Sequence, residues 1–166
     1  MSEIVSEYSQ RLYWVLRSFA SSHEETDDLL QDTFIKAWQG LPSFRGESGL
    51  FTWVYRIAVN VGLNNVRKKK WEALLTRENL DLITERMVDD DPMFDGDAAR
   101  RELTKAIVTL PPTQRAVFIL RYYQDLPYEQ ISEILSSSVG SLKVSYHKAC
   151  QKIKERLQDE IDLPEL

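Results

Sequence analysis

The sequence predicts an all-α protein made of two small helical domains joined by an acidic linker. Apolar residues recur at helical spacing on both sides of the linker, and no stretch alternates as a half-buried strand does. Residues 71–100 carry nine Asp/Glu against three Lys/Arg and contain turn signals such as Asp91-Pro92. We therefore expect a three- to four-helix domain over residues 1–70, a linker over 71–100 and a four-helix domain over 101–166.

The composition limits the class of protein. With 166 residues and 43% hydrophobic content, the chain can build packed cores. Its single cysteine, Cys150, excludes an internal disulfide and suits a reducing compartment. Glu3 and Glu7 stand where a secretory signal needs a basic flank and an apolar core, and no apolar run reaches the roughly 20 residues that span a bilayer. We expect a soluble cytoplasmic protein without membrane insertion.

The net charge of −5 conceals two basic segments. Residues 45–70 hold six Lys/Arg against one Asp/Glu, and residues 143–156 hold five against one. Local basic patches of this kind neutralise phosphates. The distribution of charge therefore favours a nucleic-acid partner, which the whole-chain value alone would argue against.

Three helices are expected in the first domain. Ser22 and Glu25 form a capping-box pattern that starts the second helix, and Gly40-Leu41-Pro42 ends it. The third helix is expected from Ser48 to about Lys70. The apolar positions are Tyr8, Leu12, Val15, Leu16 and Phe19 on the first helix, Leu30, Phe34, Ala37 and Leu41 on the second, and Phe51, Val54, Ile57, Ala58, Val61 and Val66 on the third.

The outward face of the second helix mixes apolar and polar side chains. Once the core positions are assigned, the residues left outside are Leu29, Gln31, Asp32, Ile35 and Lys36. Such a mixture is more typical of a protein-binding surface than of a solvated face, although an ordinary amphipathic helix is the alternative.

The segment from Phe44 to Asn60 combines aromatics, cations and amides, and it leads into the basic run at residues 67–70. Aromatics that stack on bases beside cations that hold phosphates are typical of single-strand nucleic-acid binding. The alternative is that the aromatics on the third helix belong to its core. Phe44, Arg45 and Ser48 lie on a Gly-flanked loop, where core packing is less expected. Asn60 and Asn64 lie one helical turn apart, and amides suit the reading of base edges.

The second domain ends in a helix-turn-helix pattern. Helices are expected over residues 101–109, 113–123, 128–135 and 139–157, with a tight break at Ser136-Ser137 and Ser138 as a candidate N-cap. On the last helix the buried stripe is Leu142, Tyr146, Ala149 and Ile153. The side chains available to DNA are Ser138, Ser141, Lys143, Ser145, His147 and Lys148. A polar helix face without a DNA role is the alternative.

The chain lacks the patterns of an enzyme. Two distant histidines and one cysteine do not make a zinc site, and no Gly-rich phosphate loop, nucleophile elbow or convincing carboxylate pair is present. We therefore expect no catalytic residues, no metal and no cofactor.

Taken together, these motifs resemble an extracytoplasmic-function sigma factor of bacteria, a branch of the sigma-70 family. The match covers both domains in order and nearly the whole chain except residues 71–100. The segments that carry it are 28–38, 44–48, 52–60, 110–115, 128–131 and 138–143.

The resemblance implies a role for each segment. Residues 1–70 correspond to sigma region 2 and 101–166 to region 4. The implied contacts with the −10 promoter element are Phe44, Arg45, Ser48, Phe51, Arg56, Asn60, Asn64, Arg67 and Lys68. Those with the −35 element are Ser138, Ser141, Lys143, Ser145, His147 and Lys148, and those with core polymerase are Asp28, Leu29, Gln31, Asp32, Ile35 and Lys36. The implied partners are the β′ clamp helices and β flap of core RNA polymerase, promoter DNA and an anti-sigma factor.

Two positions depart from the family pattern. The family commonly has an arginine at the position of Ser145 and another basic residue at that of Cys150, so we expect weaker phosphate or guanine contacts there. A redox role for Cys150 is less favoured than an inert one. The alternative function is a helix-turn-helix regulator that acts on duplex DNA without polymerase. A helical adaptor that binds only proteins is a third possibility, but it needs neither basic patch.

Overall fold

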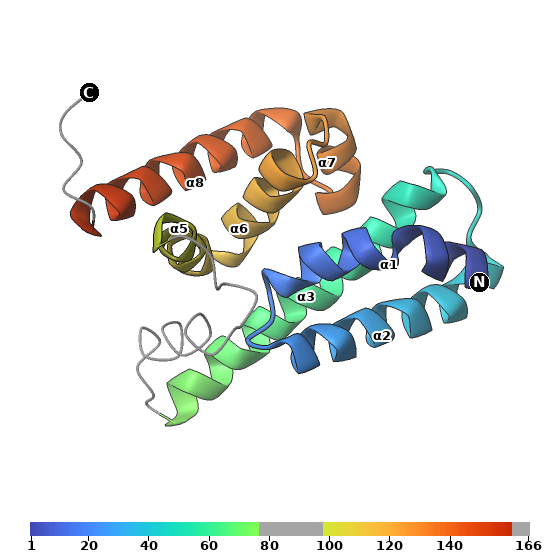
Figure 1. Ribbon diagram of the computed structural model, residues 1–166. Coiled ribbons are helices and arrows are strands. Elements are labelled where there is room, and N and C mark those ends of the chain that lie inside the picture. Colours follow the sequence, from blue (N-terminus) through green and yellow to red (C-terminus); the bar gives the residue numbers. More distant parts are fainter. Residues whose placement is uncertain (77–97, 161–166) are drawn as a thin grey trace.

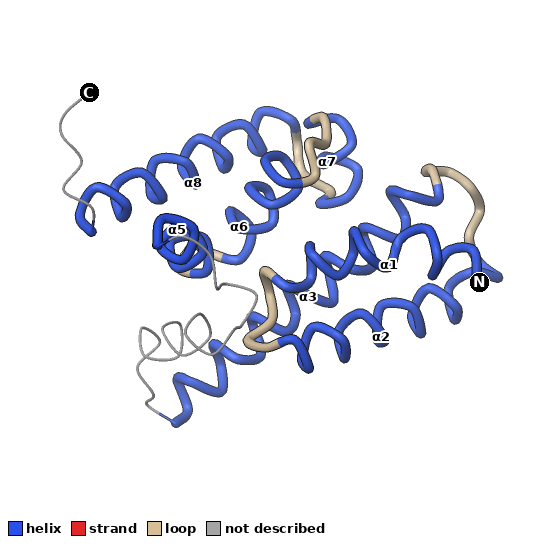
Figure 2. Tube along the Cα trace, viewed as in Figure 1, coloured by secondary structure: helices blue, strands red, loops and turns tan. Residues whose placement is uncertain are grey.

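The computed structural model describes residues 1–76 and 98–160, and within these residues it contains helices and turns but no strands (Figures 1 and 2). The prediction of an all-α fold is confirmed. Residues 77–97, which make up most of the predicted linker, lie outside the described residues, as do 161–166. None of the described helices is long and apolar enough to cross a membrane.

The first unit consists of three helices, α1 (Ser2–Arg17), α2 (His23–Gly40) and α3 (Leu50–Thr76), with the 3-10 turn η1 (Leu41–Ser43) after α2. In Figure 1, α1 and α2 lie along α3. The helix α3 begins two residues after the predicted start and continues beyond Lys70. Residues 71–76, which we assigned to the linker, are therefore helical. The fully buried side chains include Leu12, Val15, Leu16, Val54, Tyr55 and Ala58.

The buried face of α2 differs from the predicted stripe. Its buried residues are Thr26, Leu29, Thr33 and Ala37, while Leu30, Phe34 and Leu41 are half-buried at its edge. The Oγ1 atoms of Thr26 and Thr33 donate to the carbonyl oxygens four residues earlier, each at 2.8 Å. Because these hydroxyls find partners on the helix itself, threonine can line the core. The buried face of α2 that hydrophobicity alone predicts is therefore rotated relative to the face that the structure buries.

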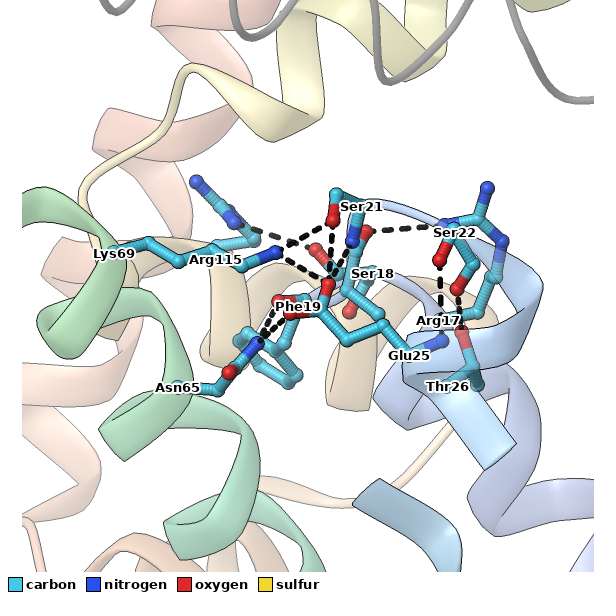
Figure 3. A network of polar contacts seen from close by, with 11 residues as sticks. Arg17, Ser18, Phe19, Ser21, Ser22, Glu25, Thr26, Asn65, Lys69 and Arg115 are labelled. Carbon is cyan, nitrogen blue, oxygen red and sulfur yellow. Dashed lines mark hydrogen bonds and ion pairs between the residues drawn. The ribbon is translucent and has the colours of Figure 1, made fainter. Parts of the chain in front are cut away.

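The turn between α1 and α2 is fastened to α3 by a polar network (Figure 3). Lys69 forms an ion pair with Glu25 and donates to Ser21 Oγ at 2.7 Å. Asn65 Nδ2 donates to the carbonyl of Phe19 at 3.1 Å and to Glu25 Oε1 at 3.2 Å. Burial by itself would raise the pKa of Glu25, but hydrogen bonds from Lys69 and Ser21 outweigh it and lower that pKa. The carboxylate is therefore held charged at the centre of the network.

The same turn requires a glycine on α3. A Cβ atom at Gly62 would lie 2.5 Å from Cδ2 of Phe19, whose ring is buried against the helix. The absence of a side chain at Gly62 lets Phe19 pack directly on the α3 backbone. The predicted N-cap is also present, since Ser22 Oγ accepts from the backbone N–H of Glu25 at 3.1 Å. The Glu25 carboxylate does not bond back to Ser22 but accepts from the backbone and hydroxyl of Ser21.

The second unit contains α5 (Ala98–Val108), α6 (Pro112–Phe118), the π-helical turn η3 (Ile119–Tyr123), α7 (Tyr128–Leu135) and α8 (Val139–Glu160). The start of α5 at Ala98 places residues 98–100 in a helix instead of the linker. The predicted helix over 113–123 changes to π geometry at Ile119. Ser136 adopts the left-handed conformation, with φ of 52°, at the turn between α7 and α8. The helix-turn-helix prediction is confirmed: α7 has the predicted bounds, the turn lies at Ser136, and α8 begins at Val139 as predicted but continues to Glu160 instead of ending at Leu157.

The two units pack against each other. Helices α6 and α7 contact α3, and Figure 1 shows α7 beside the first turns of α3. The sequence indicated two domains on either side of a linker but nothing about this contact. The described part of the chain therefore forms one body in which the second unit covers one side of α3.

Candidate nucleic-acid and polymerase interfaces

The loop between η1 and α3 surrounds a pocket. Its lining includes the predicted residues Phe44, Arg45, Ser48 and Arg56, together with Ser43, Glu47 and Trp53. Gly46, with φ of +71°, lets the loop turn above the start of α3. The half-buried Phe44 ring lies 4.8 Å from that of Trp53, measured between centroids, at an angle of 38°. The pocket thus combines aromatic faces with two guanidinium groups.

Trp53 was not among the predicted site residues. Its place on a helix with apolar neighbours made core packing the simpler interpretation. In the structure it is half-buried beneath Phe44, and a Cβ atom at Gly40 would lie 3.0 Å from its Cζ2. The indole therefore forms the wall between the pocket and the end of α2. A pair of aromatics separated by a Gly-rich loop was the available sequence signal.

Phe51 does not lie in this pocket. Its ring stacks on Tyr55 at 4.1 Å, meets Tyr8 edge-on at 6.0 Å, and is covered by the Arg11 guanidinium at 5.0 Å. The prediction that Phe51 contacts DNA is therefore not supported by its position. Its helical spacing relative to Tyr55 places it in the wall of the first core, which is the alternative that the sequence left open.

Arg56 is engaged by the second unit. Its Nε and Nη2 atoms donate to the backbone carbonyl of Glu133 at 3.1 and 2.8 Å. Glu133 lies in the last turn of α7, where carbonyl oxygens lack partners within the helix and carry partial negative charge. The guanidinium that we expected to hold phosphate is therefore occupied in this arrangement.

The remaining predicted residues on α3 lie in solvent. Asn60, Asn64, Arg67 and Lys68 are all exposed. Arg67 Nη1 donates to Asn64 Oδ1 at 3.4 Å, and Lys68 Nζ lies 3.9 Å from Glu72 Oε1. With Arg56, residues Asn60, Asn64 and Lys68 recur every four positions, so they form one row that leads away from the pocket.

On α2, five of the six predicted polymerase contacts are at least partly accessible. Asp28, Gln31, Ile35 and Lys36 are exposed, and Asp32 is half-buried with its Oδ1 atom 3.5 Å from Lys36 Nζ. The expectation that Leu29 lies outside is wrong, because its side chain is only 9% exposed. The exposed apolar groups on this face are Ile35, at 48%, and Trp38, at 61%. Trp38 was absent from the predicted set.

The predicted face of α8 is accessible. Ser141, Lys143, His147 and Lys148 are exposed and Ser145 is half-buried, while Ser138 caps the helix by accepting from the N–H of Ser141 at 3.2 Å. Leu142, Ala149 and Ile153 are buried and Tyr146 is half-buried, as the predicted stripe requires. Cys150 is half-buried beside Tyr146, whose pKa is raised by burial and by a hydrogen bond with the Cys150 thiol.

Tyr128, at the start of α7, joins two cations at the base of this face. The guanidinium carbon of Arg121 lies 5.3 Å from the centre of its ring, and Lys143 Nζ lies 5.8 Å from it. Both distances are within the range of cation–π attraction. The ring therefore holds Lys143 close to the first helix of the helix-turn-helix. Among the described residues no cluster of potential metal ligands is present.

Comparisons with known proteins agree with this geometry. Residues 4–72 match the family model described as Sigma-70 region 2, and residues 100–153 match Sigma-70, region 4. The chain is 32% identical over 163 residues to the ECF RNA polymerase sigma-E factor of Haemophilus influenzae, covering 93% of this chain and 86% of the relative. It is 31% identical over 159 residues to the RNA polymerase sigma factor YlaC of Bacillus subtilis, covering 95% and 91%.

Two solved structures have a similar fold. The sigma factor RpoE of Bartonella quintana, in complex with the anti-sigma factor NepR, gives a TM-score of 0.66 at 24% identity and covers 95% of this chain and 96% of its own. CnrH, in complex with the cytosolic domain of CnrY, gives a TM-score of 0.67 at 23% identity and covers 96% and 88%. Because the alignments cover almost the whole chain, the similarity in fold extends over both units.

Proposed function

The chain belongs to the extracytoplasmic-function sigma factors of the sigma-70 family, and we propose how its two units divide the work of promoter recognition. As a member of this family it is an initiation factor and not an enzyme; it binds core RNA polymerase and directs transcription to specific promoters. The family thus favours this function over a regulator that acts on duplex DNA without polymerase. In our proposal the α1–α3 unit docks on polymerase and opens the −10 element, and the α5–α8 unit reads the −35 element.

The observation that supports the −10 function is the row of polar side chains along α3. The row begins at the Phe44 pocket and continues through Asn60 and Asn64 to Lys68. A base that leaves the duplex loses its stacking, which costs a few kcal/mol and is recovered by new stacking and hydrogen bonds. Phe44 and Trp53 offer the stacking faces and Asn60 offers the amide. Arg45, Arg67 and Lys68 would hold phosphates of the same strand.

The exposed face of α8 supports the −35 function. In a helix-turn-helix the N-terminal part of the second helix enters the major groove, and flanking cations hold phosphates. Ser141, Lys143 and Ser145 lie in the first two turns of α8, and His147 and Lys148 follow. We propose that Ser141 and Ser145 reach base edges and that Lys143 and Lys148 hold phosphates of the backbone.

The outer face of α2 is the proposed polymerase contact. Ile35 and Trp38 are apolar and exposed, and charged groups at Asp28, Asp32 and Lys36 surround them. A large aromatic inside a polar rim is the usual composition of a binding hot spot. We propose that this face docks on the β′ clamp helices and that the second unit contacts the β flap.

We further propose that an anti-sigma factor controls the chain. The two structural neighbours with this fold were solved with the anti-sigma factor NepR and with the cytosolic domain of CnrY. The place of action would be the cytoplasm, where polymerase and promoter DNA are found.

Promoter-directed transcription with added core polymerase tests the proposed division. We expect Asn60→Ala to impair strand opening at the −10 element while binding to core polymerase stays unchanged. Permanganate reactivity of unpaired thymines measures the opening. Gln10→Ala, an exposed change on α1, is the control. Equal loss of opening and of core binding would mean that Asn60 has a structural role. DNA binding without polymerase, never followed by specific initiation, would favour the duplex regulator.

A further inference from the structure

We propose that Val144 is a specificity residue of the second unit and reads the 5-methyl group of a thymine in the −35 element. The inference rests on the proposed function, because it takes α8 as the helix that enters the major groove. Val144 was not among the predicted DNA contacts. In the structure it lies in the second turn of α8 and is 54% exposed. An aliphatic side chain therefore stands on the surface proposed for DNA.

The direction of Val144 follows from the packing of α8. The helix packs on α5, α6 and α7, and Figure 1 shows it on the side of the second unit away from α3. Its buried side chains include Leu142, Ala149 and Ile153. Ile153 follows Val144 by nine residues, which make two and a half turns at about 3.6 residues per turn. Val144 therefore lies opposite the buried stripe, at the centre of the outward face.

Polar side chains surround Val144 on this face. Ser141 lies three residues before it and Lys148 four residues after it, and both are exposed. Lys143 is held to one side, since its Nζ atom lies 5.8 Å from the ring centre of Tyr128 on α7. The middle of the proposed DNA face is therefore apolar, and its edges carry the hydroxyl and the cations.

The folding of the second unit does not account for a valine at this position. A β-branched side chain has a lower helix propensity than alanine, and Val144 lies outside the hydrophobic core. Among the described residues of this unit, the other exposed large apolar side chains are Tyr122 and Tyr123. Their rings pack with that of Phe118 at centroid distances of 5.1 and 6.2 Å. A contact with a partner gives Val144 the role that folding does not.

The chemistry of the major groove selects thymine as the base that Val144 contacts. Of the four bases, only thymine presents a methyl group there, while the rest of the groove edge consists of hydrogen-bond donors and acceptors. A valine placed against a donor or acceptor removes water from it and returns no hydrogen bond, which costs free energy. Against the thymine methyl, the same side chain buries apolar surface. Val144 therefore favours thymine and disfavours the other three bases.

Neighbouring residues of α8 then have different tasks. Lys143 and Lys148 hold phosphates and contribute affinity that depends little on sequence. Val144 carries no charge and contributes a preference for one base. The salt dependence of binding should therefore follow the lysines, and the base preference should follow the valine.

Selection of promoter DNA by the full chain bound to core polymerase tests this role. The probes are duplexes of a promoter that this holoenzyme transcribes, with the −35 element randomised, and the bound fragments are sequenced. The wild type should prefer thymine at one position, and Val144→Ala should accept cytosine there equally well, with the other positions unchanged. Alanine favours the helix, so the variant should fold. Val5→Ala, at an exposed position on α1, is the matched control.

Removal of the methyl group from the DNA gives the second measurement. Deoxyuridine in place of the preferred thymine deletes only the 5-methyl group. It should weaken binding of the wild type about fourfold, the effect of one buried methyl-sized group. The same change should weaken Val144→Ala less than about twofold, because the two substitutions remove one contact. A 5-methylcytosine in place of cytosine at this position should strengthen binding of the wild type and leave the variant unchanged.

Lys148→Ala separates failure of the inference from failure of the proposed function. If Lys148→Ala weakens binding to all sequences but Val144→Ala keeps the thymine preference, or deoxyuridine weakens wild type and Val144→Ala equally, α8 binds DNA and Val144 does not read the methyl group. If Lys148→Ala changes neither affinity nor salt slope and Val144→Ala keeps the preference, α8 is not the DNA-reading helix, and the proposed −35 function fails together with the inference.

Discussion

The two basic surfaces of this sigma factor use their cations differently. Between residues 45 and 70, Arg56 is bound to Glu133, Arg67 and Lys68 contact neighbours on α3, and Lys69 belongs to the Glu25 network. On α8, Lys148, Lys152 and Lys154 all extend into solvent. A charge count treats these segments alike, but geometry leaves more cations for phosphate on α8. We expect α8 to hold duplex DNA largely by charge, and α3 to hold an opened strand largely by stacking and hydrogen bonds.

The largest effect is expected when two adjacent lysines of α3, Lys69 and Lys70, are substituted one at a time. Lys69→Met should destabilise the protein by about 2 kcal/mol, because it leaves the Glu25 carboxylate half-buried without its ion pair. Lys70→Met changes an exposed side chain and should leave stability within about 0.5 kcal/mol. Urea denaturation measures both. If Lys69→Met lowers the stability no more than Lys70→Met does, Lys69 is not a structural cation.

The second test concerns charge on α8. Lys143→Ala should weaken binding to −35 duplex by up to about tenfold and reduce the log–log salt slope by about one, since one phosphate contact is lost. Lys36→Ala, on the opposite unit, is the control for net charge. Affinity titrations at several salt concentrations provide the measurement. An unchanged slope would remove Lys143 from the phosphate contacts.

A smaller effect is expected at Tyr128, which lies between Arg121 and Lys143. Tyr128→Leu should lower −35 affinity about two- to fivefold, the size of one exposed cation–π contact. Tyr128→Phe retains the ring and should bind like wild type. In the Lys143→Ala background the leucine substitution should add little. Full additivity would mean that Tyr128 acts independently of Lys143.

The last test concerns how the stability of the protein depends on pH in the acid range. The pKa of Glu25 is lowered in the folded protein, so the stability that its charge contributes is present above the unfolded value of about 4.5 and is lost as the pH falls through the folded value. Glu25→Gln should flatten the acid side of the stability profile. Denaturation midpoints between pH 6 and pH 3 measure this. A variant with the wild-type slope would place the acid sensitivity on other carboxylates.

The sequence pattern predicted the helix bounds and buried faces more accurately in the second unit than in the first. In the helix-turn-helix, the prolines before α6 and α7, the serine cap and the apolar stripe all agree, and the bounds of α7 are those predicted. On α2, two buried threonines rotated the core face, so Leu29 was placed outside. On α3, helical spacing could not distinguish Phe51, which packs on Tyr55, from Trp53, which lines the pocket.

By itself the sequence determined the all-α class, the order of the helices and the family, because periodicity, caps and motifs are local properties of the chain. Only the tertiary structure decided which cations remain for DNA and how the two units meet. The contacts of Tyr55, Arg56 and Arg115 join residues 69, 77 and 97 positions apart. No local pattern encodes such a pairing, because it depends on the packing of complete helices. This contact between the two units therefore became visible only when α7 was placed beside α3.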